Sequence, residues 1–540
     1  MAPRANRNRG ASPGGPRGRS RILFGDSDVH APTGSEAASF DRFVIDQLGV
    51  PGPTLIENAG RSAALVLERI FARGSVVVFA GSGNNGGDGL ALARALAGWG
   101  RSVTVVQASA RSPDARLLHQ WPLPTLDAGA EGARGEIQRV TASAGVLVDA
   151  VLGTGISGAP RTPQARILEG MNRAGRPLLS LDIPSGVDAD TGAVPGAAAR
   201  ADVTAAFGWP KLGSLLQPGR VHAGRLVAVE IGFPPVPRGT FGARVVTPAW
   251  AQDMLPVRRP ETHKHQVGSL LLLAGAPGMA GAAIMAARAA LRAGAGFVRI
   301  ASASSNRSVL QGAVPEAVFV DAADRPALAR AAMGSTAVAA GPGLGVAPEA
   351  AAALEAVLEA SGDAPVLLDA DALNLVAADA GPPLGDLGRA RPVLVTPHRG
   401  EMKRLVAAAA DLPDLPHELA LDRAAAWSCT VLLKGNPSVV ATPSKRLLVG
   451  GLGSSDLAAA GMGDVLSGVA GSLLAQGCDP SVAGALALHL TGVAAALGNE
   501  GPGLVPGDVI ARLSAAVRRQ PDRRSRLGLP FVIFDQEAPR

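Results

Sequence analysis

The chain has 540 residues, of which 47% are hydrophobic, so it is long enough to form several domains with large apolar cores. Two cysteines in this length exclude a disulfide-stabilised scaffold and are typical of a reducing compartment, here the cytoplasm. Aromatic residues make up 3% and tyrosine is missing, which argues against a surface that stacks nucleic-acid bases. Glycine, proline and arginine interrupt the apolar runs, so we expect no membrane-spanning helix.

The formal charge of +6 has its origin at the N-terminus. Six arginines precede the first acidic residue, Asp26, and account for the whole excess: Arg4, Arg7, Arg9, Arg17, Arg19 and Arg21. Residues 1–21 are rich in proline, glycine and serine without apolar periodicity, which predicts a disordered basic tail. A solvated extension is the simpler interpretation of this tail and nucleic-acid binding the alternative. We expect neither a nucleic-acid nor a membrane partner.

Residues 22–235 alternate short β-branched runs with helical stretches such as Gly89–Ala97. Strands that are apolar along their whole length predict a parallel sheet covered on both faces. The expected strands are Val76–Phe79, Val103–Val106, Val146–Asp149, Leu178–Asp182, Val203–Phe207 and Leu226–Glu230. Residues 236–262 are dense in proline and are expected to form a linker.

Residues 263–515 show a second alternation of strands and alanine-rich helices, followed by a C-terminal tail, 516–540. The expected strands are Ser269–Leu273, Phe297–Ile300, Ala337–Ala340, Val366–Asp369, Val393–Thr396 and Thr430–Leu433. The second half does not repeat the first. The sequence therefore predicts two different α/β domains.

The densest signal in the first domain is the turn Gly81-Ser-Gly-Asn-Asn-Gly-Gly-Asp-Gly89, between a strand and a helix. Glycines permit close approach of a ligand, and a helix N-terminus presents free N–H groups to an anion. A tight turn without a ligand is the alternative. The polar side chains of Asn84, Asn85 and Asp88 inside the turn favour a ligand.

Two more predicted strands end in polar turns, at Asp149 and at Asp182. Because ligands of open parallel sheets bind at the carboxyl ends of strands, these turns are expected to form one pocket with the glycine-rich turn. Either aspartate alone is equally compatible with a helix cap.

The motifs Asn84-Asn-Gly-Gly-Asp-Gly, Asp149-Ala-Val-Leu-Gly-Thr-Gly and Asp182-Ile-Pro-Ser-Gly-Val-Asp resemble those of the NAD(P)H-hydrate epimerase domain, over about residues 42–233. The resemblance implies a Rossmann-like three-layer α/β fold that binds hydrated NADH or NADPH together with a potassium ion. It implies that Asn85, Asp149 and Ser185 ligate potassium. The residues implied to contact the hydrated cofactor are Asn84, Asn85, Gly86, Gly87, Asp88, Gly153, Thr154, Gly155, Ile156, Ser157, Gly158, Ala159 and Asp182.

Interconverting the two configurations at the hydroxyl-bearing carbon of such a substrate requires proton transfer. Asp182 and Lys211, the latter in Phe207-Gly-Trp-Pro-Lys-Leu-Gly, are the groups that we predict to exchange the proton. A surface lysine without a catalytic role is the alternative for Lys211.

In the second domain the sharpest signal is Gly461-Met-Gly-Asp464, which opens an apolar helix. Free N–H groups at the helix start stabilise a transferring phosphoryl group, and the neighbouring carboxylate can accept a proton from a hydroxyl. An ordinary acidic residue in a first helical turn is the alternative for Asp464. Lys434-Gly-Asn-Pro-Ser438 follows a predicted strand and suits a nucleotide-binding loop, and His398 lies at another strand end.

Together with Gly278-Met-Ala-Gly-Ala282 and Gly341-Pro-Gly-Leu-Gly345, these motifs resemble the ADP/ATP-dependent NAD(P)H-hydrate dehydratase domain, over about residues 256–513. The resemblance implies a ribokinase-like α/β fold that phosphorylates the hydrate with Asp464 as base and then eliminates phosphate. Its residues are implied to contact the hydrated cofactor at Ala282, Gly345, His398 and Asp464, and the nucleotide at Lys434, Gly435, Asn436, Pro437, Ser438 and Gly463. The chain departs from the family pattern at Arg399, Pro437, Ser438 and Met462.

Both halves thus indicate one function, the repair of hydrated NADH and NADPH by epimerisation and dehydration. The implied phosphoryl donor is ADP or ATP with Mg²⁺, ADP being converted into AMP. The alternatives are a ribokinase-like small-alcohol or vitamin-precursor kinase, and a first domain that binds nucleotide without catalysis. The sequence leaves open whether the protein forms a homo-oligomer.

Overall fold

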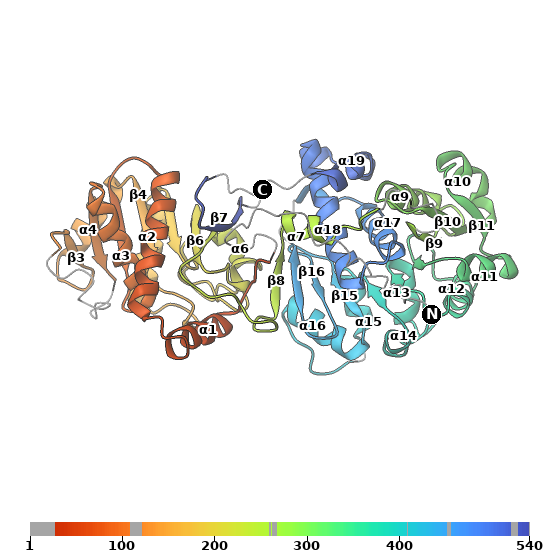
Figure 1. The fold of residues 1–540 in the computed structure, drawn as a ribbon, viewed down its shortest axis with the longest axis horizontal. Helices are drawn as coiled ribbons and strands as arrows, with labels where there is room; N and C mark the ends of the chain where they lie inside the picture. The colour runs from red at the N-terminus through yellow and green to blue at the C-terminus, as the bar shows by residue number, and fades with distance from the viewer. Residues whose placement is uncertain are drawn as a thin grey trace, which may run out of the picture.

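The computed structural model describes residues 28–108, 121–258, 261, 267–407, 409–450, 455–519 and 527–538. The expected basic tail, 1–21, lies outside these residues. The described chain forms two α/β lobes that lie side by side, each built on its own sheet (Figure 1). The prediction of two different α/β domains is confirmed.

The first sheet has eight strands, which are parallel except for the antiparallel pair β18 and β7. Its order is β18 (Val532–Gln536), β7 (Arg225–Val229), β6 (Val203–Phe207), β5 (Leu178–Leu181), β4 (Val146–Ala150), β1 (Val76–Ala80), β2 (Val103–Gln107) and β3 (Thr125–Asp127). Its helices are α1 (Gly34–Asp46), α2 (Gly52–Ile70), α3 (Asn84–Gly98), α4 (Ala133–Ser143), α5 (Thr162–Arg173) and α6 (Gly219–His222).

Alternate residues of each buried strand in the first sheet pack on opposite faces, as the period of two requires. Val76 and Val78 of β1 belong to the core beneath α2 and α3. Val77 and Phe79 belong to the core on the other side, with α4 and α5. The all-apolar runs in the sequence therefore correspond to strands with helices on both faces.

Among the described residues, the second sheet has ten strands, and the antiparallel pairs are β15–β16 and β16–β17. Its order is β11 (Val318–Asp321), β10 (Phe297–Ser302), β9 (Ser269–Leu273), β12 (Ala337–Ala340), β13 (Val366–Leu368), β14 (Val393–Val395), β15 (Thr430–Leu433), β16 (Val439–Ala441), β17 (Leu447–Gly450) and β8 (Ala243–Val246).

Helices cover both faces of the second sheet, and each face has its own core. One core contains residues of α7 (Pro248–Met254), α9 (Ala280–Arg292), α10 (Arg307–Ala313), α17 (Met462–Ala475), α18 (Pro480–Gly498) and α19 (Pro506–Arg518). The other contains residues of α11 (Arg325–Met333), α12 (Pro348–Ala360), α13 (Ala370–Ala377), α14 (Leu384–Ala390), α15 (Arg399–Leu405) and α16 (Pro416–Trp427).

Two segments expected to lie outside the domains each contribute a strand to a sheet. Residues 236–262, interpreted as a linker, contain β8, which pairs with β17 at the edge of the second sheet. Residues 516–540, interpreted as a tail, contain β18, which pairs with β7 at the edge of the first sheet. Apolar residues with β propensity, Val245 and Val246 in β8 and Val532 in β18, explain why these short segments pair.

The two domains share part of one hydrophobic core. The segment before α1 pairs with β8, since Ala31 N donates to Ala243 O and Val245 N to Val29 O. Val29 and Ala31 lie in one buried cluster with Leu226 of the first sheet and Val449 of the second. Burial of this junction makes the domains one packed body.

Helix α18 is a long apolar run that the sequence analysis did not consider. Its 19 residues are long and apolar enough to cross a membrane by length and composition. However, 67% of its most apolar window is buried inside the protein, where α18 packs against α17, α19 and the second sheet. We therefore interpret α18 as a core helix.

Candidate active sites

The polar motifs of the first domain meet at the carboxyl ends of its central strands. β6, β5, β4 and β1 are neighbours, and the predicted site residues follow their carboxyl ends. Asp149 lies at the end of β4, Asp182 directly after β5, and Lys211 shortly after β6. The structure therefore brings together the three turns that the sequence placed in one pocket.

The glycine-rich turn packs closely against its own domain and leaves a helix N-terminus uncapped. A Cβ at Gly81 would lie 1.9 Å from the carbonyl oxygen of Val151, and one at Gly86 would lie 2.0 Å from the carbonyl oxygen of Gly81. These two glycines therefore allow close packing of the protein on itself. Helix α3 begins earlier than expected, at Asn84, and its N-cap Gly83 offers no side-chain cap. Its first N–H groups therefore remain available to an anion.

The side chains of Asn85, Asp149 and Ser185 form a buried polar cluster. Ser185 Oγ donates to Asp149 Oδ1 at 2.5 Å, and Ser185 N donates to Asp149 Oδ2 at 2.9 Å. Asn85 Nδ2 donates to the carbonyl oxygen of Leu152 at 2.8 Å, whereas the buried Asn85 Oδ1 has no hydrogen-bond partner. Burial raises the pKa of Asp149, and hydrogen bonds from Ser185 and Ser180 oppose that shift.

Asp182 and Lys211 form an ion pair at the same end of the sheet, beyond the carboxyl ends of β5 and β6. Lys211 Nζ lies 2.5 Å from Asp182 Oδ1, and it also donates to the carbonyl oxygens of Phe207 at 3.0 Å and Trp209 at 3.3 Å. Three acceptors match the three protons of the ammonium group. Lys211 is only 4% exposed, so the alternative of a surface lysine is wrong. Asp182 itself has a left-handed backbone (φ 65°), which is uncommon outside glycine and concentrated at functional sites.

Two further carboxylates surround this pair. Burial raises the pKa of Asp88 well above its ordinary value, and the nearby charges of Asp182 and Asp41 add to the shift while Lys211 opposes it. Burial also raises the pKa of Asp41, on α1. The charge of Lys211 lowers this pKa and the charge of Asp182 raises it. Asp88 was predicted from its motif. Asp41 was missed, because a single acidic residue in an amphipathic helix carries no signal of its own.

The loop after β4 forms the rim of this site. A Cβ at Gly153 would lie 3.2 Å from the Cβ of Asn85, so the loop starts in close contact with the glycine-rich turn. Gly155 and Gly158 have no atom within 4 Å of an added Cβ, which leaves them open to a ligand. The remaining predicted contacts, Thr154, Ile156, Ser157 and Ala159, are half-buried or exposed.

The motifs of the second domain also converge on the carboxyl ends of adjacent strands. β9, β12, β13, β14 and β15 follow one another in the sheet, and the loops after four of them carry Ala282, Gly345, His398 and Lys434. Ala282 lies in the first turn of α9, where it faces Gly343 of the loop after β12. Asp464 reaches this edge from the first turn of α17.

Helix α17 begins with an uncapped N-terminus. Its N-cap, Gly461, adopts a left-handed conformation (φ 86°), and no side chain caps the first N–H groups. Burial raises the pKa of Asp464 to about 6, the charges of Asp369 and Asp371 add to the shift, and Lys434 opposes it. The Asp464 carboxyl is therefore poised to take up or release a proton near neutral pH.

Lys434–Ser438 is the connection between the antiparallel strands β15 and β16. Ser438 Oγ closes it by donating to the carbonyl oxygen of Gly435 at 3.0 Å and accepting from Gly435 N at 3.1 Å. Lys434 Nζ lies 2.6 Å from Asp369 Oδ1. A Cβ added at Gly463 would lie 3.6 Å from the same Lys434 Nζ. The loop predicted to hold nucleotide thus places an ammonium group at the start of α17.

His398 caps helix α15. Its Nδ1 accepts from the N–H groups of Gly400 at 2.9 Å and Glu401 at 3.3 Å, and Glu401 Oε2 accepts from His398 N at 2.8 Å. Nε2 therefore carries the proton of the neutral ring and faces Glu401 Oε1 at 3.2 Å. The side chain remains 53% exposed, which leaves its outer face free for a ligand.

Sequence reasoning missed Asp369 and Asp371, which lie in this second cluster. Asp369 follows β13 and is 1% exposed, and Asp371 Oδ2 accepts from Gly345 N at 2.8 Å. The predicted strand Val366–Asp369 included Asp369 as its last residue, and that position at the carboxyl end of a parallel strand was the signal available.

Comparison with known proteins identifies the family. The family described as YjeF-related protein N-terminus matches residues 52–213, and NAD(P)H-hydrate dehydratase matches residues 270–516. The bifunctional NAD(P)H-hydrate repair enzyme of Salinibacter ruber is 39% identical over 496 residues, which cover 84% of this chain and 89% of the relative. The chain belongs to the family of bifunctional NAD(P)H-hydrate repair enzymes. It is an NAD(P)H-hydrate epimerase and a nucleotide-dependent NAD(P)H-hydrate dehydratase.

A second full-length relative agrees with this assignment. The NAD(P)H-hydrate repair enzyme of Moorella thermoacetica is 35% identical over 493 residues, covering 86% of this chain and 92% of the relative. The crystal structure of the ADP/ATP-dependent NAD(P)H-hydrate dehydratase from Bacillus subtilis, co-crystallised with ATP/Mg²⁺, is 30% identical, with a TM-score of 0.42 over 50% of this chain and 98% of that one. The full-length relatives favour the repair enzyme over a kinase fused to a silent module.

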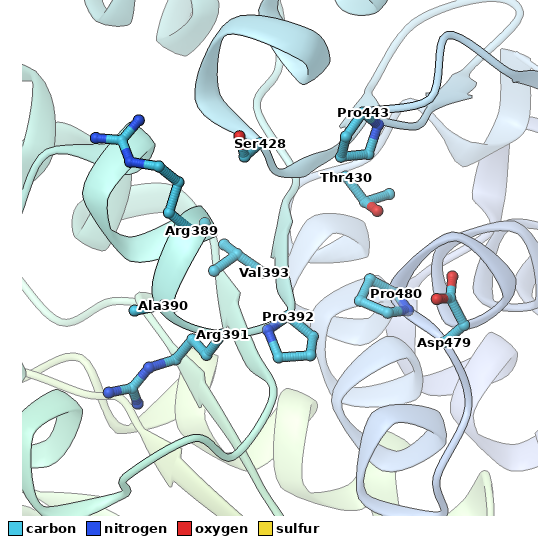
Figure 2. A pocket seen from close by; sticks show the side chains of 11 residues that line it. Arg389, Ala390, Arg391, Pro392, Val393, Ser428, Thr430, Pro443, Asp479 and Pro480 are labelled. Carbon is cyan, nitrogen blue, oxygen red and sulfur yellow. The ribbon is translucent and has the colours of Figure 1, made fainter.

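One surface pocket of this repair enzyme lies away from both sites. Figure 2 shows Arg389, Arg391, Pro392, Thr430 and Pro480 around it. Pro392 and Thr430 stand at the amino ends of β14 and β15, at the opposite edge of the sheet from Lys434 and His398. In parallel α/β sheets the chemistry occurs at the carboxyl edge, so this pocket is not part of the dehydratase site.

Proposed function

We propose that Asp182 is the group that exchanges a proton during epimerisation and that Lys211 holds it in place. Asp182 Oδ1 accepts hydrogen bonds from Lys211 Nζ and from Phe207 N at 3.0 Å, so the carboxylate is oriented from two sides. This leaves Oδ2 for the substrate. The ammonium group of Lys211 and the N–H group of Phe207 thus hold the carboxylate in one orientation toward the substrate.

A potassium ion fits the cluster of Asn85, Asp149 and Ser185. The buried Asn85 Oδ1 lacks a hydrogen-bond partner, and Asp149 is a buried carboxylate whose partners among the described residues are all neutral hydrogen-bond donors. A cation would give Asn85 Oδ1 a partner and would balance the negative charge of the Asp149 carboxylate. Without such a charge, burying an ionised carboxylate costs free energy. When bound, the ion would supply positive charge beside the glycine-rich turn, Asn84–Asp88.

In the second domain, Asp464 is proposed to take the proton of the hydrate's hydroxyl group as that oxygen attacks the terminal phosphorus of the nucleotide. The first N–H groups of α17 and the ammonium group of Lys434 stabilise the transferring phosphoryl group. Phosphate then leaves with the electrons of the carbon–oxygen bond, and loss of a proton from the neighbouring carbon restores the double bond. Phosphorylation thus replaces hydroxide, a poor leaving group, by a good one.

The donor is ADP or ATP, which residues Lys434–Ser438 and Gly463 would hold. Mg²⁺ would neutralise its phosphates, and transfer of the terminal phosphoryl group from ADP would leave AMP. The hydrated cofactor lies between this loop and Ala282, Gly345 and His398. The protein acts on small molecules in the cytoplasm. Its free cysteines agree with a reducing compartment, and burial raises the pKa of the Cys429 thiol to about 12.

One observation carries this proposal. At the carboxyl ends of the strands, each sheet places a lysine within 2.6 Å of a carboxylate: Lys211 with Asp182, and Lys434 with Asp369. Complementation tests it. Asp182→Asn should recover NADH from one epimer only, and Asp464→Asn should recover none. Mixed in one tube with nucleotide, the two variants should together recover both epimers. Failure of the mixture to consume the second epimer would overturn the assignment of separate sites.

A further inference from the structure

Asp369 occupies an unusual place at the start of α13. It is the N-cap residue of that helix, a position where aspartate normally accepts hydrogen bonds from the helix N–H groups. Its side chain makes no such cap. The next residue, Ala370, adopts a left-handed conformation (φ 45°), which is uncommon for a residue with a Cβ and costs backbone free energy. The strain coincides with a carboxylate that points away from its own helix.

Both oxygens of the Asp369 carboxylate are instead bound by groups of the dehydratase site. Oδ1 accepts from Lys434 Nζ at 2.6 Å, and Oδ2 accepts from Ser467 Oγ at 2.5 Å. Ser467 lies three residues after Asp464 on α17, so the two face the same side of the helix. Asp369 and Ser467 are both almost completely buried. The carboxylate therefore connects the end of β15 to the first turns of α17.

A purely structural role explains this ion pair poorly. Buried ion pairs add little stability compared with well-packed apolar residues, because removing charges from water is costly. The pair nevertheless places the ammonium group beside Gly463, at the uncapped start of α17, and next to Asp464. Asp369 is the only hydrogen-bond acceptor of Lys434 Nζ among the described residues, so two of its three protons remain for a ligand.

We propose that Asp369 is a positioning residue of the dehydratase reaction, which holds Lys434 against the transferring phosphoryl group and sets the charge environment of Asp464. This inference rests on the proposed role of Asp464 as base. Among the described residues, the charged groups that influence Asp464 are Asp369 and Asp371, from the end of β13 and α13, and Lys434, from the end of β15.

The charge arrangement gives opposite predictions for two variants. Burial and the like charge of Asp369 raise the pKa of Asp464 to about 6, whereas Lys434 lowers it. In the parental enzyme the acid limb of kcat/KM for NADH recovery should therefore lie near pH 6. Asp369→Asn should move this limb to lower pH, and Lys434→Met should move it to higher pH. A merely structural role would reduce activity equally at all pH values.

Rate constants provide a second readout. Asp369→Asn releases Lys434, and misplacement of a catalytic group by about 1 Å costs about 10²-fold in rate, so kcat should fall by that order. KM for the hydrated cofactor should change less than kcat. Ser467→Ala keeps the charge of Asp369 and loses only the bond to Oδ2, so its acid limb should stay in place. Asp386→Asn, an exposed carboxylate on α14, is the matched control and should behave as the parent.

The outcomes separate this inference from the proposed function. If Asp464→Asn retains nucleotide-dependent recovery, the assignment of the base fails first. If Asp464→Asn is inactive but the acid limbs of Asp369→Asn and Lys434→Met coincide with that of the parent, the role of Asp369 is refuted. Should Asp369→Asn fail to fold, the shift in Lys434→Met and its absence in Ser467→Ala decide the question.

Discussion

Lys211 Nζ lies 2.5 Å from Asp182 Oδ1, although the two residues belong to loops that follow different strands. Two backbone carbonyl oxygens accept the remaining protons of the ammonium group. Because all three of its protons are engaged, Lys211 is better suited to hold Asp182 than to donate a proton directly. The pair acts as one unit in our account of epimerisation.

This unit predicts a specific epimer dependence. A Lys211→Ala, Asp182→Ala double variant should still repair one epimer at the parental rate when nucleotide is supplied. The other epimer should be recovered only as fast as it interconverts without enzyme. The single substitutions should be strongly non-additive, because the first removes most of the effect. Chiral separation of residual substrate over time measures this, and unchanged consumption of both epimers would refute the role of the pair.

Asp464→Asn should abolish recovery of NADH while epimer interconversion continues. The amide cannot accept the proton of the attacking hydroxyl group, and a positioned base contributes about 10²–10⁴-fold. Because the epimerase site is on the other domain, its undiminished activity serves as an internal control for correct folding. Nucleotide-dependent recovery at the parental rate would contradict the assignment.

The potassium site can be tested through stability as well as activity. Potassium should raise the melting temperature of the parental protein compared with a large organic cation at equal ionic strength, because a ligand that binds the folded state stabilises it. Asn85→Ala removes the unpartnered oxygen and should eliminate this increase. Asn84→Ala, an exposed neighbour in the same turn, should retain it. An equal response in both variants would show that the ion binds elsewhere.

Potassium should also matter more for the first domain than for the second. Exchange for a cation of different size should weaken binding of the hydrated cofactor at the epimerase site. The dehydratase reaction should respond less, and a larger effect there would contradict the assigned ligands.

Asp88 gives a prediction for stability against pH. Burial raises its pKa well above 3.8, so the folded protein binds the proton more tightly than the unfolded chain does. The stabilising effect of that proton is complete below pH 3.8 and is lost as pH rises through the folded-state pKa. Asp88→Asn removes this dependence, so the melting temperature of the variant relative to the parent should increase from pH 4 to pH 8. A difference that stays constant with pH would contradict the raised pKa.

The sequence was sufficient to predict the strands that are apolar along their length. Each strand expected in the two domains is present, with bounds that differ by one or two residues at most. It was not sufficient for β3, β8, β11, β16, β17 and β18, which were not expected, because strands this short gain much of their stability from the strands they pair with. The charge-free helix α18 was overlooked as a membrane candidate, and only its burial identifies it as core.

The site was predictable where residues form local motifs. Asn85, Asp149 and Ser185 come together as expected, and so do Asp182 and Lys211. Asp41 and Asp369 were missed because their importance depends on neighbours that are distant in sequence. Asp41 lies on α1, one residue after Phe40, whose ring contacts that of Trp209 at a centroid distance of 5.6 Å. Only this tertiary packing of α1 on the Lys211 loop gives the carboxylate its place.

The C-terminal strand should stabilise the first domain. Arg225 Nε and Nη2 each lie 2.8 Å from the carboxylate of Asp535, and Leu527 is 5% exposed in the core of the first sheet. Burying one leucine side chain contributes about 1.5–3 kcal/mol. Removal of residues 527–540 should therefore reduce the hydrogen-exchange protection of β7 and leave that of β9 and β12 unchanged. Glu537→Gln, at the more exposed residue directly after β18, is the control. Full protection of β7 after truncation would contradict this role.

The most direct test of the central claim uses the intact protein and a mixture of both epimers of NADH hydrate. Without nucleotide, the enzyme should equilibrate the two epimers and form no NADH. With ADP or ATP, both epimers should be converted completely, and the absorbance of NADH should recover in full. Recovery that stops when one epimer is exhausted would contradict the epimerase activity, and full recovery without nucleotide would contradict the kinase-like step.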